Sequence, residues 1–222
     1  MASRTRAGAA PRAPLSTERV LRAALVLADA GGIEALTMRR LGQQLGVEAM
    51  SLYKHVANKD EILDGIVDLA VGEIALPAPG QGWKAAMRRR GISAHEVLLR
   101  HPWACLLLMS RTNVGPAMLR YVDSTLGSLR EAGFPVELAD YAWNAMDSHI
   151  YGFTLQELNF PIEPQQFAEA ARTWLPRLPR DEYPHLTEMA VHVMEGRYDG
   201  VPDFTFGLDL LLDGLERLLA SR

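Results

Sequence analysis

Apolar residues recur every three or four positions along almost the whole chain, which is the spacing of one face of an α-helix. The first apolar stripe predicts a helix that begins after Ser16, a favourable N-cap, and ends at Gly31–Gly32. A second helix is expected to begin after Thr37 and to end at about Leu45, because Gly46 follows. No alternating pattern of useful length indicates a strand. The sequence therefore predicts an all-α protein.

A short helix over residues 49–56 is expected after a three-residue turn. At about 100° per residue, Leu52 and Val56 project from the same side of this helix and define its buried face. The opposite face carries Met50, Ser51, Lys54 and His55. Because so short a helix is stable only when its neighbours hold it in place, its exposed face is the first candidate for a binding surface.

Asn58 is expected to cap a longer helix, because Glu61 follows it at the spacing of a capping box. The Pro/Gly-rich stretch 76–82 ends that helix and favours a domain boundary or hinge. Further helices are predicted at 83–100, from Pro102 onward, and at 115–132, 135–159, 185–196 and 203–220. Residues 165–184 contain three prolines and are expected to form a short helix and an irregular loop. The prediction is nine or ten helices, preceded by a disordered basic arm at residues 1–14.

The formal net charge of −4 hides an uneven distribution of charged residues. Residues 1–60 hold nine Lys and Arg against five Asp and Glu, whereas the rest of the chain holds 14 against 22. A basic quarter on an acidic body indicates that only this quarter meets an anion, although chance clustering would give the same counts. The single cysteine, Cys105, lies in the apolar run 103–109 and is expected to be a buried thiol. That run is too short to cross a bilayer and no secretory signal is apparent, so a cytoplasmic protein is expected.

Two helices joined by a short turn that contains Gly46, the second of them projecting, are typical of a helix-turn-helix. The major groove of DNA admits such a helix, where Ser51 can bond to base edges and Met50 can contact a thymine methyl group. Thr37 and the free amides of its helix can hold a phosphate, and Arg39 can reach a guanine. Further phosphate contacts are expected from Tyr53, Lys54, His55 and Lys59. On spacing alone, the solvated surface of an ordinary helical domain is an equally good interpretation.

The stretch ALTMRRLGQQLGVEAMSLYKHVANKDEILDGIVD (35–68) resembles the DNA-binding signature of TetR-family transcriptional regulators in residue types, in spacing and in distance from the N-terminus. The resemblance implies a three-helix DNA-binding domain at residues 15–62 and an effector-binding and dimerisation domain at residues 63–222. Carried over by position, the DNA-facing residues are Thr37, Met38, Arg39, Ala49, Met50, Ser51, Tyr53, Lys54, His55 and Lys59.

The second half is similar to the tetracycline-repressor-like branch of that family in the segments LLRHPW (98–103), LREAGFPVELADYAWNAM (129–146) and HIYGFTLQE (149–157). Tetracycline repressors hold a magnesium-bound drug partly through a histidine, and Leu108 occupies the corresponding place in this chain. Glu157 matches an acidic position of the same site, but a single carboxylate is not a magnesium site. We therefore expect no metal and no cofactor.

The resemblance implies a cavity for a small-molecule effector, bounded by the predicted helices 83–100, 102–110, 115–132 and 135–159. Such cavities are mostly apolar with a few placed polar groups. The residues expected to bind the ligand are Trp103, Met109, Asn113, Met118, Tyr121, Trp143, Met146, His149, Ile150 and Phe153. The four apolar members on the 135–159 helix form one stripe, and such a stripe is more often plain core. His149 is equally compatible with a core or interface histidine.

The last predicted helix carries leucines at coiled-coil-like spacing, namely Leu208, Leu211, Leu212, Leu215, Leu218 and Leu219. Paired with the 135–159 helix across a two-fold axis they would form a four-helix bundle in a homodimer, with burial inside one chain as the alternative. An enzyme is the rival class, but no catalytic fingerprint or metal-binding histidine spacing occurs. A helical small-molecule-binding protein without DNA binding is a third. We expect a ligand-responsive repressor that binds a palindromic DNA operator as a homodimer.

Overall fold

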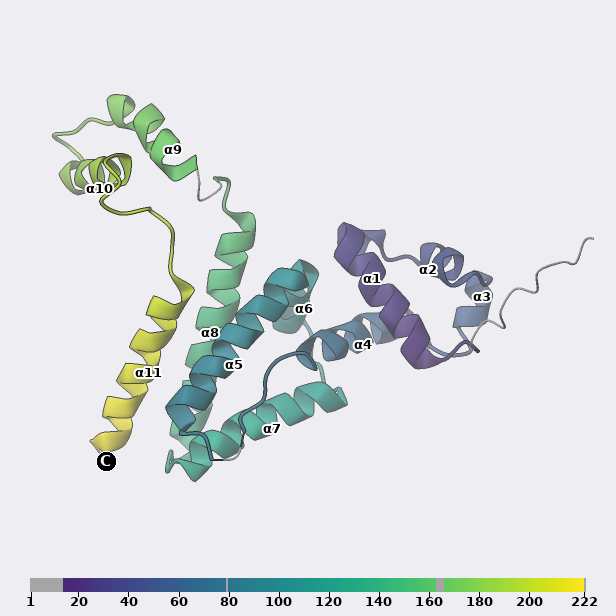
Figure 1. Ribbon diagram of the computed structural model, residues 1–222. Coiled ribbons are helices and arrows are strands. Elements are labelled where there is room, and N and C mark those ends of the chain that lie inside the picture. The colour runs from purple at the N-terminus through teal and green to yellow at the C-terminus, as the bar shows by residue number, and fades with distance from the viewer. Residues whose placement is uncertain (1–13, 79, 163–165, 222) are drawn as a thin grey trace, which may run out of the picture. The chain divides into compact units, whose positions relative to one another are not determined.

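The computed structural model describes residues 14–78, 80–162 and 166–221, and all of the regular structure in these ranges is helical (Figure 1). The all-α prediction is confirmed. The α-helices are α1 (Thr17–Ala35), α2 (Met38–Leu45), α3 (Ala49–Leu52), α4 (Lys59–Val71), α5 (Trp83–Arg100), α6 (Pro102–Ser110), α7 (Pro116–Glu131), α8 (Val136–Asn159), α9 (Phe167–Trp174), α10 (Pro184–Met194) and α11 (Phe204–Ala220). These eleven helices of the described residues are slightly more than the nine or ten expected, and the short helix expected in the proline-containing segment after α8 is α9.

The chain divides into two units, each with its own core. Unit 1 comprises residues up to Gly72 together with His101–Met118, and so contains α1–α4, α6 and the first turn of α7. Unit 2 comprises Glu73–Arg100 and Leu119–Arg222. Residues 1–13 of the predicted basic arm lie outside the described residues. The domain limits inferred from the sequence stay predictions.

The helices of unit 1 begin at the caps that the sequence predicts. The Ser16 hydroxyl accepts a hydrogen bond from the Arg19 amide at 3.2 Å, and the Asn58 side chain accepts one from the Glu61 amide at 2.8 Å. The prediction that α1 ends at Gly31–Gly32 is only partly right. Gly32 has a φ of 72° and interrupts the helical geometry there, but one further turn continues to Ala35. Val20, Ala24 and Ala28 form the buried stripe of α1 within unit 1.

The core of unit 2 lies among α5, α8 and α11, which pack pairwise against one another (Figure 1). Leu208, Leu212 and Leu215 of α11 are buried inside this core, whereas Leu218 is exposed. The leucines therefore do not form a single seam between two chains. Half of the predicted set is buried within one chain. Ion pairs between α5 and α11 close the edge of this packing, from Lys84 to Asp213 and Glu216 and from Arg88 to Asp209.

Helices α9 and α10 pack against each other and against the short 3-10 turn Leu175–Arg177 (Figure 1). Within the described part of the chain, no helix is long and apolar enough to cross a membrane. Cys105 is buried on α6, and burial raises the pKa of its thiol to about 11. The expectation of a buried thiol at this position is confirmed.

Candidate nucleic-acid interface and effector region

The turn between α2 and α3 is tight and depends on two glycines. Gly46 adopts a left-handed conformation with φ 70° and ψ 36°, and its amide bonds to carbonyl oxygens of the last turn of α2. Gly42 lies inside α2 where the chain returns, and the Val47 amide donates to the Gly42 carbonyl at 2.9 Å. A Cβ atom at Gly42 would lie 2.8 Å from the Val47 carbonyl oxygen, so only glycine lets the two helices approach this closely.

Helix α3 consists of only four residues, so the predicted helix over 49–56 is too long. After Leu52 the chain continues as a turn, in which the His55 and Val56 amides donate to the Leu52 carbonyl at 2.9 and 3.1 Å. The predicted facing is confirmed for the buried side and for Met50 and Lys54, whereas Ser51 and His55 are half-buried. Leu52 and Val56 are buried in unit 1, whereas the Met50 side chain is 75% exposed.

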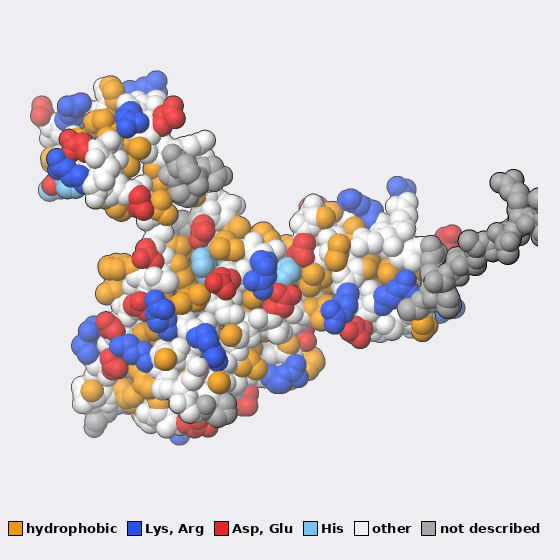
Figure 2. Space-filling model, in the orientation of Figure 1, with side chains coloured by type: hydrophobic (Ala, Val, Ile, Leu, Met, Phe, Trp, Pro, Cys, Tyr) orange, Lys and Arg blue, Asp and Glu red, His pale blue; other side chains and the backbone are white. Residues whose placement is uncertain are grey.

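The ten predicted DNA-facing residues all lie in unit 1, between Thr37 and Lys59. Those that are exposed to solvent are Thr37, Arg39, Met50, Tyr53, Lys54 and Lys59, and those that are half-buried are Met38, Ala49, Ser51 and His55. The Thr37 hydroxyl accepts from the Arg40 amide at 3.2 Å, so it caps α2. Figure 2 shows Lys and Arg side chains on the part of unit 1 that carries α1, α2 and α3.

Two contacts fix the segment that follows α3. The Thr17 hydroxyl at the start of α1 donates to the His55 carbonyl at 2.9 Å. The Glu61 carboxylate accepts from the Ala57 amide while its own amide donates to Asn58, which makes a reciprocal cap one residue wider than the predicted capping box. The residues between α3 and α4 are thereby tied to the start of both α1 and α4.

Three aspartates at successive turns of α4 hold the segment that connects α6 to α7 within unit 1. Asp60 and Asp64 both pair with Arg111, at 3.1 and 2.7 Å. The Asn113 side chain donates to the Asp64 carbonyl at 3.1 Å and accepts from the Gly115 amide at 2.8 Å.

Asp68 caps α7 from a different helix. Its carboxylate accepts from the amides of Ala117 and Met118 at 3.2 and 2.9 Å, the second and third residues of α7. An N-cap side chain normally does this, but the N-cap position here is Gly115. A Cβ atom on Gly115 would lie 2.3 Å from the Asp68 carboxylate. The Asp68 carboxylate can therefore cap α7 only because Gly115 has no side chain.

Four of the predicted ligand-binding residues lie in unit 1. Trp103 is buried, and its indole donates to the Asp29 carboxylate of α1 at 2.7 Å. Met109 is exposed, and Asn113 is occupied by the loop contacts described above. The Met118 amide bonds to Asp68. Trp103, Asn113 and Met118 thus serve contacts within unit 1.

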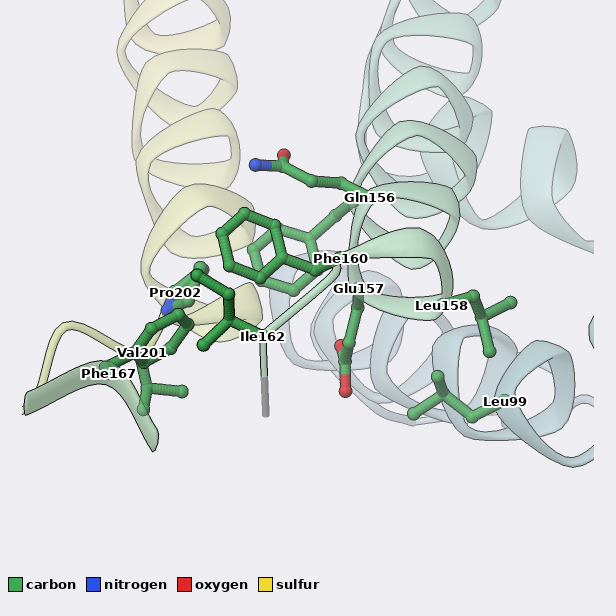
Figure 3. Close-up of a pocket in the computed structure, with 10 residues that line it drawn as sticks. Leu99, Gln156, Glu157, Leu158, Phe160, Ile162, Phe167, Val201 and Pro202 are labelled. Carbon is green, nitrogen blue, oxygen red and sulfur yellow. The ribbon is translucent and has the colours of Figure 1, made fainter. Parts of the chain in front are cut away.

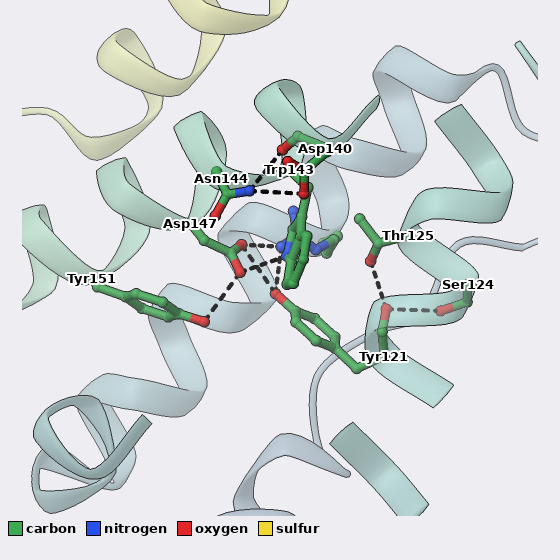
Figure 4. Close-up of polar contacts among 9 residues, drawn as sticks. Tyr121, Ser124, Thr125, Asp140, Trp143, Asn144, Asp147 and Tyr151 are labelled. Atoms are coloured by element: carbon green, nitrogen blue, oxygen red, sulfur yellow. Dashed lines mark hydrogen bonds and ion pairs between the residues drawn. The ribbon is translucent and has the colours of Figure 1, made fainter. Parts of the chain in front are cut away.

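The other six lie in unit 2, where Met146 and Ile150 are core residues and Tyr121 is fully buried. Tyr121 and Trp143 belong to a polar cluster around the Asp147 carboxylate (Figure 4). That carboxylate accepts from the Trp143 indole at 2.7 Å, from the Tyr151 hydroxyl at 3.1 Å and from Tyr121 at 3.5 Å, and it pairs with Arg90 of α5. Burial raises the pKa of both tyrosines, so both stay protonated donors.

Arg90, which sequence analysis did not single out, is among the largest fully buried residues of the chain's described part. It lies in the run of three arginines at 88–90, which looks like a solvated surface. Helical spacing could have predicted the burial of Arg90, because it lies on the same face of α5 as the buried residues Met87 and Ala94. Although burial opposes the charge, the Tyr121 and Asp147 contacts hold the pKa of Arg90 above its usual value.

His149 and Phe153, the remaining predicted residues, join a ring cluster with His95 and Phe204. The Phe204 ring stacks on both imidazoles, with centroid distances of 4.2 Å to His95 and 5.0 Å to His149. His95 bonds to the Thr154 hydroxyl at 2.8 Å and lies 3.2 Å from the Glu157 carboxylate. Burial lowers the pKa of His95.

A pocket of about 470 Å³ opens next to this cluster at the C-terminal end of α8 (Figure 3). Figure 3 shows Gln156 and Glu157 from α8 on one side of it and Phe167 of α9 with Val201 and Pro202 on the other. Of the predicted ligand-binding residues, only Phe153 lines this pocket. Among the residues that the structure describes, no three His, Cys, Asp or Glu side chains are grouped so as to hold a metal ion.

Two family descriptions match this chain. Residues 20–66 match the bacterial regulatory proteins of the tetR family, and residues 76–219 match the tetracyclin repressor-like C-terminal domain. The chain belongs to the TetR family. It is a DNA-binding transcriptional regulator, as the resemblance in its first 70 residues implies.

Relatives of this TetR-family chain align over nearly its whole length. The HTH-type transcriptional repressor DrrR1 of Streptomyces coeruleorubidus is 31% identical over 96% of this chain and 81% of its own. The class D tetracycline repressor protein of Escherichia coli is 32% identical, with 94% and 93% covered. Among solved structures, ActR of Streptomyces coelicolor in complex with actinorhodin superimposes with a TM-score of 0.78 at 30% identity, over 93% of this chain and 99% of that one.

Proposed function

We propose that this TetR-family chain acts in the bacterial cytoplasm as a homodimeric repressor, which binds a palindromic operator through α3 and releases it when a small molecule binds in unit 2. One observation carries the DNA-binding part. Met50 is 75% exposed on a helix that Leu52 and Val56 anchor from the other side. Single exposed apolar side chains are common on protein surfaces, but Met50 lies on the projecting face of a helix-turn-helix, where the methyl groups of a major groove can cover it.

The residues around α3 supply complementary chemistry. Ser51 stands next to Met50 and can exchange hydrogen bonds with base edges. Tyr53, Lys54 and Lys59 are exposed at the end of α3 and the start of α4, where they can bind phosphates. The free amides at the start of α2 add a second phosphate site beside Thr37. Phosphate contacts on both sides of α3 would fix how deeply the helix enters the groove.

Apolar side chains on the outside of α11 support dimer formation. Phe206, Leu210 and Leu218 are 66, 55 and 53% exposed, and the first two lie one turn apart. Tyr141 and Val136 of α8 are also exposed in unit 2. A stripe of this kind on two helices that already pack together is suited to a four-helix bundle with a second copy. Two copies would place two α3 helices on successive half-sites.

Helix α4 is the proposed lever between the two activities, because it begins beside α3 and three aspartates along it hold the segment from Arg111 to Met118. An effector that shifts this segment would change the position of Asp60, Asp64 and Asp68, and with them the start of α4. Such a response requires that the effector bind the two conformers with different affinity. The complex of the relative ActR with actinorhodin supports a small-molecule effector.

Replacing Lys59 with alanine is expected to weaken binding to all DNA sequences alike. Each lost phosphate contact lowers the slope of log Kobs against log salt by about 0.9, and a dimer loses two such contacts. The measurement is fluorescence anisotropy with operator DNA between 50 and about 200 mM salt. Arg172→Ala removes the same charge from an exposed site in unit 2 and serves as the control. An unchanged slope for Lys59→Ala would remove this residue from the phosphate contacts.

Substitution of Met50 or Ser51 by alanine is expected to relax the base preference at one or two operator positions, each worth about 1–3 kcal/mol of discrimination. Selection of bound DNA from a random pool, followed by sequencing, measures this preference. Val26→Ala removes a comparably exposed apolar side chain from α1 and is the control. The same recovered sequences for all variants would exclude base reading by α3. Recovery of no DNA at all by the unmodified protein would favour a small-molecule-binding protein without an operator.

A further inference from the structure

The Arg90 guanidinium in unit 2 is enclosed by protein and incompletely hydrogen-bonded. Its side chain is 0% exposed. Nη2 donates to the Tyr121 hydroxyl at 2.6 Å and to the Asp147 carboxylate. Nε and Nη1 have no hydrogen-bond partner among the residues that the structure describes. Since a guanidinium carries five N–H donors, three of them point to no protein acceptor.

Within this cluster, donors lack acceptors, but the acceptors do not lack donors. The Asp147 carboxylate accepts from Arg90, Trp143 and Tyr151, and Tyr121 adds a longer contact at 3.5 Å. Its two oxygens are therefore supplied with donors, while Nε and Nη1 of Arg90 lack acceptors. Buried polar groups in proteins are almost always paired, and each unpaired donor is unfavourable. What the cluster lacks is an acceptor.

The groups that contact Arg90 or share its carboxylate partner are largely aromatic. The Tyr121 ring lies under the guanidinium, with its centroid 4.8 Å from Cζ. Trp143 reaches the same carboxylate as Arg90, and Met146 and Ile150 of the same helix are buried in unit 2. Figure 4 shows Tyr121, Trp143 and Tyr151 pointing towards the carboxylate of Asp147. Aromatic rings with one cation at the end fit an aromatic ligand that carries an anionic group.

We infer that the effector belongs to the class of aromatic acids, and that its carboxylate or ionised phenol accepts hydrogen bonds from Nε and Nη1 of Arg90. This inference rests on the proposed function and specifies the chemistry of its effector. A cationic ligand would face the guanidinium without a free carboxylate to bind it. A neutral ligand could also accept hydrogen bonds from the charged guanidinium, but it would lack the Coulomb attraction of an anion, which is stronger inside a protein than in water.

The full enclosure of Arg90 also bears on regulation. An effector that reaches Nε must displace side chains that cover the guanidinium, because none of its surface is open to solvent. Such a ligand therefore binds a conformer different from the one that the structure describes. A difference in affinity between two conformers is the requirement for control of DNA binding by a ligand.

The inference is tested with a panel of aromatic compounds of two to four fused rings, each present as the carboxylate, the methyl ester and the carboxamide. Affinities for the full-length protein are measured by quenching of tryptophan fluorescence. We expect at least one ring system whose carboxylate binds about 10- to 100-fold more tightly than its own ester and amide. In Arg90→Lys, which keeps the charge beside Asp147 but loses Nε and Nη1, this preference should fall to less than about threefold. Arg89→Lys, an exposed neighbour on the same helix, should keep it.

Nitrogen-15 NMR of the arginine side chains provides a second readout that does not depend on a variant folding. The Nε–H resonance of Arg90, which is slow to exchange because it is buried, should shift when the preferred carboxylate is added and stay in place with the ester. Equal affinity of acid, ester and amide for every ring system would overturn the inference, as would binding of the acids without a shift at Arg90. Operator binding by the unmodified protein, and its loss with any compound that binds, tests the proposed function separately.

Discussion

Gly42→Ala is expected to weaken operator binding strongly, because the added methyl group collides with backbone and not with a movable side chain. It would lie 2.8 Å from the Val47 carbonyl oxygen, 3.2 Å from the Ala49 amide nitrogen and 3.3 Å from its Cα. Overpacking of this kind forces the backbone to shift, which costs about 1–3 kcal/mol of folding free energy. The displacement moves α3 relative to α2, and a loss of about 1 kcal/mol of DNA contacts at each of two half-sites lowers the affinity of the dimer about 30-fold.

Fluorescence anisotropy with operator DNA measures the effect of Gly42→Ala, and circular dichroism of the same samples reports whether the helices persist. Gly127→Ala is the matched control, because Gly127 lies inside α7 with nothing within 4 Å of the added Cβ atom. The control should bind operator normally and gain about 0.5–1 kcal/mol in stability from the better helix former. Wild-type affinity in Gly42→Ala would mean that the spacing of α2 and α3 does not govern how α3 is presented.

Asp68→Ala is expected to leave operator binding nearly intact and to disconnect it from the effector. The substitution removes the acceptor of the Ala117 and Met118 amides, which costs about 1–2 kcal/mol, as the loss of a helix cap does. It also removes the contact between the last of the three α4 aspartates and the first turn of α7. The panel compound with the highest affinity should still bind, but should release operator only at concentrations at least about tenfold higher, since a coupling free energy of about 1.4 kcal/mol is lost.

Gly115→Ala acts on the same contact from the other side. Its Cβ atom would displace the Asp68 carboxylate, so the double variant should be hardly less stable than either single one. Urea unfolding of the four proteins gives this cycle, and amide exchange at Ala117 and Met118 shows whether the cap is lost. Asp123→Ala, an exposed aspartate on α7, controls for the change in charge. Additive losses from Asp68→Ala and Gly115→Ala would show that the glycine and the carboxylate do not depend on each other.

Local rules predicted the helix boundaries well where a cap was involved. The side chains of Ser16, Thr37 and Asn58 each accept the backbone amide hydrogen bond expected of an N-cap. Gly46 ends α2 in the left-handed conformation. The facing of Leu52 and Met50 also followed from periodicity alone. These features depend on residues a few positions apart, and the sequence displays such relations directly.

Features that depend on packing between distant segments could not be predicted in the same way. The end of α3 at Leu52 is set by contacts of the following turn with the start of α1, which lies 38 residues earlier. Arg90 looked like a surface residue because its partner Asp147 lies 57 residues away. The leucines of α11 form a regular repeat, but only the structure separates those that fill the core of unit 2 from those that remain exposed.

The brevity of α3 has a consequence for how this regulator can evolve. Only Ala49, Met50, Ser51 and Leu52 are helical there, and Leu52 is committed to the core. Within α3, base recognition therefore depends on at most three side chains, of which Met50 is the most exposed. A copy of the gene could acquire a new set of target promoters through two or three substitutions, while keeping its old chemical signal.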